Sequence, residues 1–127
     1  MTIELIDPEQ LSRSPAFSQV AIGRGTRAVF ISGQVAGDAR EGDDVAAQAL
    51  TVHRNLAIAL AAAGVRPSDV AKLTTYVVGY RPELLPAIAQ ARAAVFGDHR
   101  PASTLIGVAA LARPELLIEV EAIAFAE

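Results

Sequence analysis

Two carboxylates stand two residues apart in the apolar segment LLIEVEAIAF, near the end of this 127-residue chain. Side chains alternate between the two faces of a β-strand, so Glu119 and Glu121 share a face, about 6–7 Å apart. Ile123 and Phe125 follow on the same face. Two interpretations are open: a solvated or salt-bridged structural pair, or a partly buried carboxylate whose raised pKa lets it act as an acid or base near neutral pH.

Other groups with chemical potential are few. The segment SGQVAG, Ser32 to Gly37, follows an apolar run, and such a turn can bind a carboxylate or phosphate through its backbone N–H groups. The two histidines are His53, expected at the boundary of an amphipathic helix, and His99, expected in a loop. With no cysteine and no acidic residues at a helpful spacing from these histidines, we expect no metal site.

Composition narrows the classes of function. The net charge is −3, and no basic cluster with interleaved aromatic residues is present, so we expect no nucleic-acid partner. Although 52% of the residues are apolar and the mean hydropathy is +0.35, no apolar run approaches the length of a membrane span. The first residues lack the basic and apolar regions of a signal peptide, which favours a cytoplasmic protein.

Length and patterning predict one α+β domain over residues 1–127, with two helices on one face of a sheet. Asp43 or Asp44 is suited to cap the first helix and Gly64 to end it. A chain this short and apolar leaves some apolar residues on its surface. The second sheet face is predicted to be apolar, so we expect an oligomer in which a partner covers it. In chain order, the predicted elements are strands Ile3–Ile6, Phe17–Ile22 and Ala28–Ser32, a helix over 45–63, a strand over 70–80, a helix from Pro82 to about Phe96, and strands Ser103–Leu111 and Leu117–Phe125.

Three segments together resemble the RidA/YjgF family of reactive-intermediate deaminases, also labelled L-PSP endoribonucleases. They are FISGQVAGD, DVAAQALTVHRNLAIALAAAGVRPSDVAKLTTYV and RPASTLIGVAALARPELLIEVEAIA, and the resemblance runs from about Pro15 to Ala124. It implies a chorismate-mutase-like fold with a mixed sheet, assembled as a homotrimer with a barrel-like core and clefts between subunits. Members with the activity hydrolyse imines or enamines to 2-oxo acids and ammonia, and they need no cofactor.

The same resemblance assigns roles to residues. Glu119 matches the glutamate that positions the attacking water, and the Ser32-Gly33 turn is kept. Ser103 stands where the family has the arginine that binds the substrate carboxylate, so that ion pair is lost. Phe17 replaces a tyrosine and Ala89 an asparagine of the cleft. The expected substrate-binding residues are Phe17, Ser32, Gly33, Ala89, Arg100, Ser103 and Leu105, with Glu119 as the catalytic residue.

Several functions stay open at this point. The first is a trimer whose interface pocket binds, and with Glu119 hydrolyses, a small metabolite that is uncharged or differently charged. The second is an imine deaminase that holds its carboxylate through the Ser32-Gly33 turn and Arg100. The third is a non-catalytic metabolite-binding or chaperone-like trimer. The ribonuclease label is disfavoured, because one lysine, two separated histidines and an acidic chain provide no phosphate site.

Overall fold

The computed structural model describes residues 2–127 and has the predicted α+β architecture, with the elements in the predicted order. The strands are β1 Ile3–Ile6, β2 Val20–Gly23, β3 Arg27–Gln34, β4 Val70–Val78, β5 Ala102–Val108 and β6 Ile118–Ala126, and the helices are α1 Val45–Ala62 and α2 Leu85–Phe96. Short 3-10 turns, Pro67–Asp69 and Pro82–Leu84, lead into β4 and α2.

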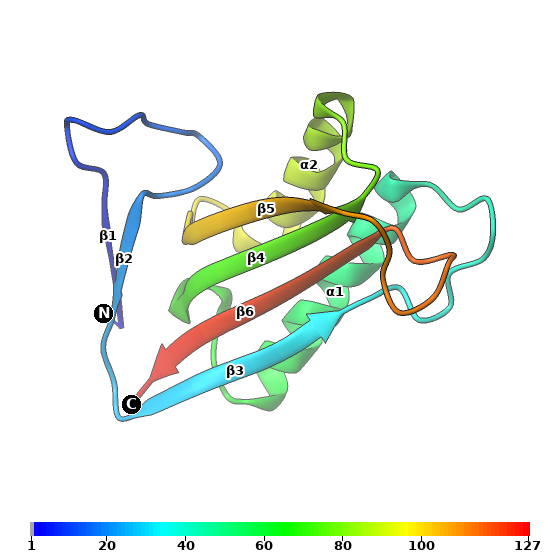
Figure 1. The fold of residues 1–127 in the computed structure, drawn as a ribbon. Helices are drawn as coiled ribbons and strands as arrows, with labels where there is room; N and C mark the ends of the chain where they lie inside the picture. Colours follow the sequence, from blue (N-terminus) through cyan, green and yellow to red (C-terminus); the bar gives the residue numbers. More distant parts are fainter. Residues whose placement is uncertain (1) are drawn as a thin grey trace.

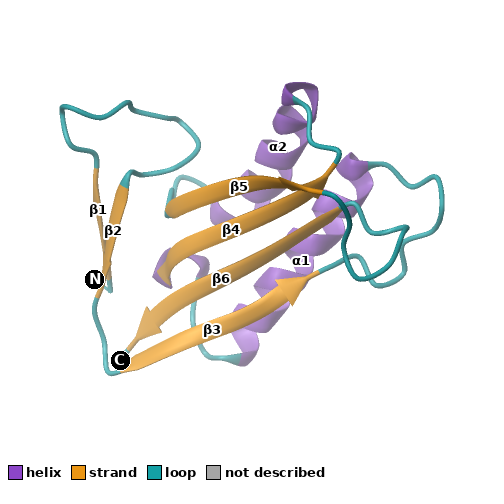
Figure 2. Ribbon diagram, viewed as in Figure 1, coloured by secondary structure: helices purple, strands orange, loops and turns teal. Residues whose placement is uncertain are grey.

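Four strands form one mixed sheet in the order β3-β6-β4-β5. β6 is antiparallel to both of its neighbours, whereas β4 and β5 are parallel. Both helices lie behind this sheet, and its front face is left uncovered (Figure 1, Figure 2). β1 and β2 form a separate antiparallel pair that stands beside the sheet in Figure 1. We call the uncovered side of the four-stranded sheet the open face and the other side the helix face.

The ends of α1 follow from local chemistry. A carboxylate oxygen of Asp44 accepts the N–H of Ala47 at 2.8 Å, which satisfies one of the free donors of the first turn. Gly64 follows the helix with φ of 73°, a left-handed conformation that glycine adopts without steric cost. In α2, Pro86 lies in the first turn, where the missing N–H removes no helical hydrogen bond. Leu85, the first residue of α2, is exposed.

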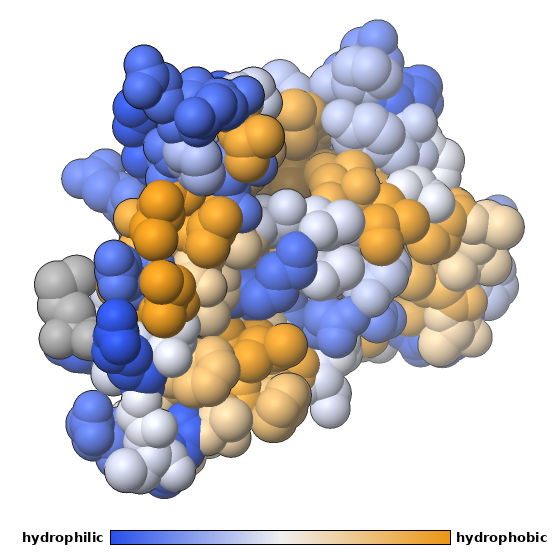
Figure 3. Space-filling model, turned by 60° about the vertical axis from the view of Figure 1, so that its left-hand side comes forward, coloured by the Kyte–Doolittle hydropathy of each residue, from blue (hydrophilic) through white to orange (hydrophobic). Residues whose placement is uncertain are grey.

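The core lies between α1 and the helix face. Along β6, burial alternates as the sequence predicts, and α1 lays its apolar stripe against this strand. The expectation for the other side of the sheet, that the open face is apolar, is wrong. It mixes polar side chains such as Tyr76 and Glu119 with apolar ones such as Phe30, which is 74% exposed. Figure 3 shows the same mixture of apolar and hydrophilic patches on the surface turned toward the viewer. The helix-facing residues of β6 are Ile118, Val120, Ala122 and Ala124.

Three local expectations need correction. The second strand begins at Val20, so Phe17 lies in the preceding loop. Ser32 and Gly33 belong to β3 and do not form a turn after it. His53 is not a boundary residue, because it is 2% exposed and packs beneath the sheet with the buried stripe of α1. Within residues 2–127, neither helix combines the length and the apolar character that crossing a membrane requires.

Candidate functional site

The Ser32-Gly33 segment forms a β-bulge opposite β6. Ile31 pairs with Ala122 and Gln34 with Val120, so three steps along β3 match two steps along β6. A bulge leaves part of the ladder unpaired and bends the strand, and such irregularities occur often beside active sites. The backbone of β3 is therefore displaced from regular pairing at the two residues that the sequence singled out.

Glu119 lies directly against this bulge. A Cβ atom built on Gly33 would stand 2.1 Å from Oε2 of Glu119 and 2.5 Å from its Cδ, closer than real Cβ atoms approach other heavy atoms. Only glycine therefore lets the carboxylate rest against the β3 backbone. The structure thus brings together Ser32, Gly33 and Glu119, which are far apart in the sequence.

The second carboxylate of β6 is already engaged. The Tyr76 hydroxyl on β4 donates a short hydrogen bond to Oε1 of Glu121. This bond, helped by burial and by the negative charges of Glu121 and Glu119, raises the pKa of Tyr76 above its ordinary value. Glu119 has no side-chain hydrogen bond within residues 2–127, so it is the carboxylate of the two that is free to act on a bound water. Of the two interpretations of the pair, a structural role suits Glu121 and a chemical role suits Glu119.

A cavity of about 350 Å³ lies on the helix face, between β4, β5 and α2. Four expected substrate-binding residues line it. They are Phe17 from the loop between β1 and β2, Ala89 from α2, and Ser103 and Leu105 from β5. Ser103 pairs with buried Leu73, and Leu105 with Thr75, so both β5 side chains point to the helix side of the sheet. The Ser103 hydroxyl therefore borders a real cavity.

Arg100 is not among the residues that line this cavity. Its Nη1 donates to the carbonyl oxygen of Ser14 at 2.8 Å, which ties down the segment that carries Phe17. The same segment is held by the Ser18 N–H, which donates to the carbonyl of Pro101 at 3.2 Å. Arg100 therefore positions a wall of the cavity, and its guanidinium is committed to a backbone partner.

The sequence analysis did not assign the two basic side chains of this cavity, His53 of α1 and Arg92 of α2. Burial lowers the pKa of His53, opposed by its hydrogen bond to the Ala49 carbonyl and assisted by the charge of Arg92. Burial also lowers the pKa of Arg92. The sequence offered only weak signals: His53 lies one residue from the apolar stripe of α1, and Arg92 is the one charged residue of α2.

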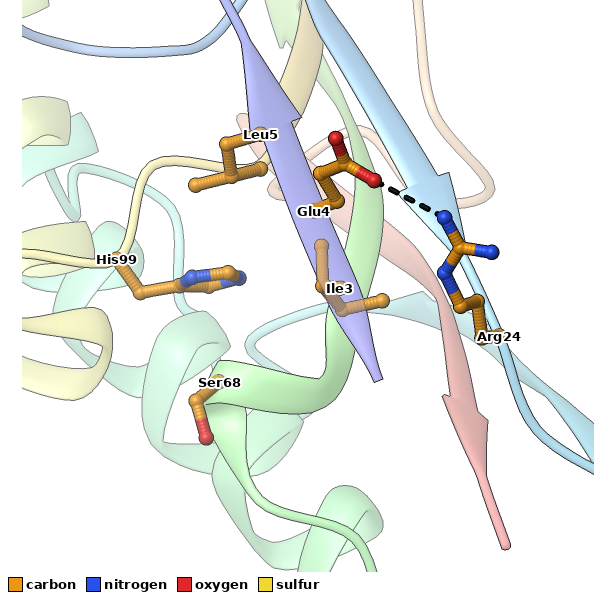
Figure 4. A pocket seen from close by; sticks show the side chains of 6 residues that line it. All are labelled: Ile3, Glu4, Leu5, Arg24, Ser68 and His99. Atoms are coloured by element: carbon orange, nitrogen blue, oxygen red, sulfur yellow. Dashed lines mark hydrogen bonds and ion pairs between the residues drawn. The ribbon is translucent and has the colours of Figure 1, made fainter. Parts of the chain in front are cut away.

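A larger cavity, about 430 Å³, opens between β1 and the start of β4 (Figure 4). Its ionisable side chains already have partners: Glu4 and Arg24 pair at 3.0 Å, and Nε2 of His99 donates to the carbonyl of Val70 at 2.8 Å. None of the expected site residues lines it. This cavity has few functional groups without a partner, so the smaller cavity on the helix face is the better candidate for a ligand-binding site.

The expected site residues thus fall into two groups on opposite faces of one sheet. Tyr76 pairs with Glu119 on the open face, whereas Leu73 pairs with Ser103 on the helix face. The bulge and Glu119 cannot reach the cavity through the sheet. Within residues 2–127, no three His, Asp or Glu side chains group in a way that could hold a metal ion.

Comparison with known proteins gives a consistent result. The sequence profile of the family described as endoribonuclease L-PSP matches residues 9–126. The Rid family protein YyfB from Yersinia pestis, described as of unknown function, is 42% identical over 98% of this chain and 99% of its own, with a TM-score of 0.91. Rv2704 from Mycobacterium tuberculosis, a member of the YjgF/YER057c/UK114 family, is 32% identical over 86% of each chain, with a TM-score of 0.66.

A curated relative agrees. The RutC family protein PH0854 from Pyrococcus horikoshii is 33% identical over 103 residues, which span 78% of this chain and 79% of that protein. The family profile covers nearly the whole chain, and the fold and the curated relative point the same way. The chain therefore belongs to the endoribonuclease L-PSP family, the family of the RidA, YjgF and RutC proteins.

Proposed function

We propose that this protein is a homotrimeric hydrolase of small imines or enamines, with a site completed between subunits and without the usual carboxylate-binding arginine at Ser103. The observation that carries the proposal is the division of the site residues between two sheet faces. One chain holds a free carboxylate on its open face and a lined cavity on its helix face. A second copy that sets its Glu119 against the first copy's cavity unites them.

The partly apolar open face supports assembly. Phe30, Ile123 and Phe125 lie on this face, and Phe30 is the most exposed large apolar side chain among those described. Exposed apolar surface on a small protein is stabilised by contact with a partner. Two polar groups of the same face, Tyr76 and Glu121, satisfy each other through a hydrogen bond, which lowers the cost of covering them.

The chemistry requires one positioned carboxylate and water. As the water oxygen attacks the carbon of the C=N bond, Glu119 accepts a water proton, and a carbinolamine forms. The imine nitrogen takes up one proton as the carbinolamine forms. The hydroxyl group then gives up its proton as the C–N bond breaks, the nitrogen takes up a second proton and leaves as ammonia, and a carbonyl compound remains. A general base of this kind contributes about 10²–10⁴-fold to the rate. The carboxylate lies against the bulge, in the room that the missing Cβ of Gly33 leaves.

The test measures hydrolysis of freshly generated 2-iminopropanoate by the wild-type protein and by Glu119→Gln. We expect the variant to lose about 100-fold or more of the rate. Glu121→Gln is the matched control: it makes the same chemical change two residues along β6, and we expect it to keep activity. Light scattering on the same samples reports the mass of the assembly. A wild-type protein that is monomeric, or a Glu119→Gln variant as active as wild type, contradicts the proposal.

A second candidate is a non-catalytic protein that binds a small metabolite. It is favoured by Ser103, whose hydroxyl carries no charge to hold a substrate carboxylate. The variant Ser103→Arg separates the two. If the wild type is inert and this variant gains hydrolysis, the scaffold and Glu119 are competent and the natural ligand has changed. If both are inert while ligand binding persists, the protein is a binding module.

A further inference from the structure

The cavity on the helix face contains a cation without a counterion. Arg92 lines it, is partly buried, and forms neither an ion pair nor a hydrogen bond with any of the described residues 2–127. The other arginines nearest to this region are engaged: Arg100 with Ser14 and Arg81 with Glu83. A partly desolvated charge is unfavourable unless an opposite charge or hydrogen-bond acceptors compensate it. The cavity is therefore suited to a ligand that brings an anion.

His53 adds a second, different requirement. Its Nδ1 lies 2.8 Å from the carbonyl oxygen of Ala49, which can only accept a hydrogen bond, so Nδ1 carries the proton. In the neutral ring, Nε2 is then a hydrogen-bond acceptor, and the bond from Nδ1 is the only one that the ring makes within residues 2–127. Burial and the charge of Arg92 lower the pKa of His53, which keeps the ring neutral. A ligand that donates an N–H or O–H to Nε2 satisfies it.

The rest of the lining fits a small, compact ligand. Thr75, Tyr80 and Ser103 line the cavity with side chains whose hydroxyls can donate or accept, and most of the remaining lining residues are apolar. The volume, about 350 Å³, is near the lower end of the range for small-molecule sites. A guanidinium binds a carboxylate through two parallel N–H groups, which fixes the orientation of the ligand as well as its charge.

We propose that Arg92 and His53 form the recognition site for a small carboxylic acid that bears an N–H or O–H group on the carbon next to the carboxylate. Arg92 binds the carboxylate, and Nε2 of His53 accepts the neighbouring N–H or O–H. The charge lost at Ser103 on the sheet is thus supplied from α2. The identification of this ligand with the hydrolysed substrate rests on the proposed function. The existence of the binding site does not depend on it.

The experiment is equilibrium binding to the intact protein, by calorimetry, of three stable probes of similar size. Lactate has both the carboxylate and the hydroxyl, pyruvate lacks the hydroxyl donor, and lactamide lacks the negative charge. We expect lactate to bind more tightly than either of the others. In Arg92→Gln we expect lactate to bind about 10- to 150-fold more weakly, the loss of one charged hydrogen-bonded pair, with lactamide unchanged.

The control is Arg54→Gln, which makes the same change on the residue after His53, at an exposed position of α1 outside the cavity. It should bind lactate as the wild type does. Arg92→Lys, which keeps the charge but not the paired N–H geometry, should fall between wild type and Arg92→Gln, and it serves if Arg92→Gln does not fold. His53→Leu should remove the preference for lactate over pyruvate.

The inference is overturned if the wild type does not bind lactate, if lactamide binds as tightly, or if Arg92→Gln binds as wild type does. These outcomes are separable from the fate of the proposed function. Lactate binding that depends on Arg92, without imine hydrolysis, supports this site and contradicts the hydrolase. Hydrolysis that is equal in wild type and Arg92→Gln supports the hydrolase and contradicts this site.

Discussion

The approach of Gly33 to Glu119 makes a sharp prediction for Gly33→Ala. The new Cβ would lie 2.1 Å from Oε2 of Glu119, so the carboxylate must move. It can do so, because the contact is with the far end of a flexible side chain and Gly33 has no positive φ. Turning the Glu119 side chain costs about 0.5–1.5 kcal/mol, and replacing glycine by alanine within a strand returns about 0.5–1 kcal/mol.

The two effects nearly cancel, so we expect the free energy of unfolding of Gly33→Ala to change by less than about 1 kcal/mol. Hydrolysis should respond far more, since a displacement of about 1 Å in a reacting group can cost about 100-fold in rate. Urea unfolding and 2-iminopropanoate hydrolysis, measured on the same preparation, test both halves. Gly37→Ala is the control, because a Cβ there meets nothing within 4 Å.

Two outcomes refute this reasoning. Wild-type activity in Gly33→Ala means that the position of the Glu119 carboxylate does not matter for the reaction. A loss of several kcal/mol of stability means that the Glu119 carboxylate is held too firmly to move, and that Gly33 is required mainly for folding.

Two further predictions concern the core. Because the pKa of His53 is lowered on folding, its contribution to stability is complete above the ordinary value of 6.5 and is lost as pH falls from there toward the folded-state pKa. Between pH 5 and 7.5, the melting temperature should therefore fall less with decreasing pH in His53→Leu than in wild type. Parallel curves for the two proteins would contradict a buried neutral ring. The side chain of Gln48 donates to the carbonyl of Glu115 and accepts the N–H of Leu117, each at 2.8 Å. Because these backbone groups lose their partner in Gln48→Leu, this variant should lower the free energy of unfolding, measured by urea titration, by about 1–3 kcal/mol. An unchanged free energy would show that water replaces the side chain.

Some of this architecture could be predicted because its causes are local. Asp44 caps α1 with its own side chain, and Gly64 takes the left-handed conformation that ends the helix. The alternation along β6 is equally local: each second residue faces the helices whatever the neighbouring strands are. The separation of Glu119 from the core therefore followed from a single segment of sequence.

What escaped prediction depends on pairing and packing between distant segments. The bulge at Ser32 and Gly33 exists only in the register that β3 adopts against β6. Arg100 meets a carbonyl 86 residues away in sequence, so its commitment to Ser14 has no local signature. His53 is buried because α2 packs across α1, and the periodicity of α1 alone places it beside the stripe.

Ser103 shows why the loss of one charged residue is a poor guide to the chemistry of a whole cavity. From the sequence, a serine in place of an arginine favours a ligand that is uncharged or differently charged. The structure adds Arg92, which enters the same cavity from α2, a different element at a different place in the chain. The affinity of the cavity for an anion depends on whether any element that lines it provides a partly desolvated cation, and this element need not be β5. The element that holds the ligand does change: Arg92 would hold a carboxylate from α2, whereas a residue at position 103 would hold it from β5. In the proposed trimer a partner subunit would bring its Glu119 to this cavity, which is why the oligomer and the Arg92 variants need to be studied together.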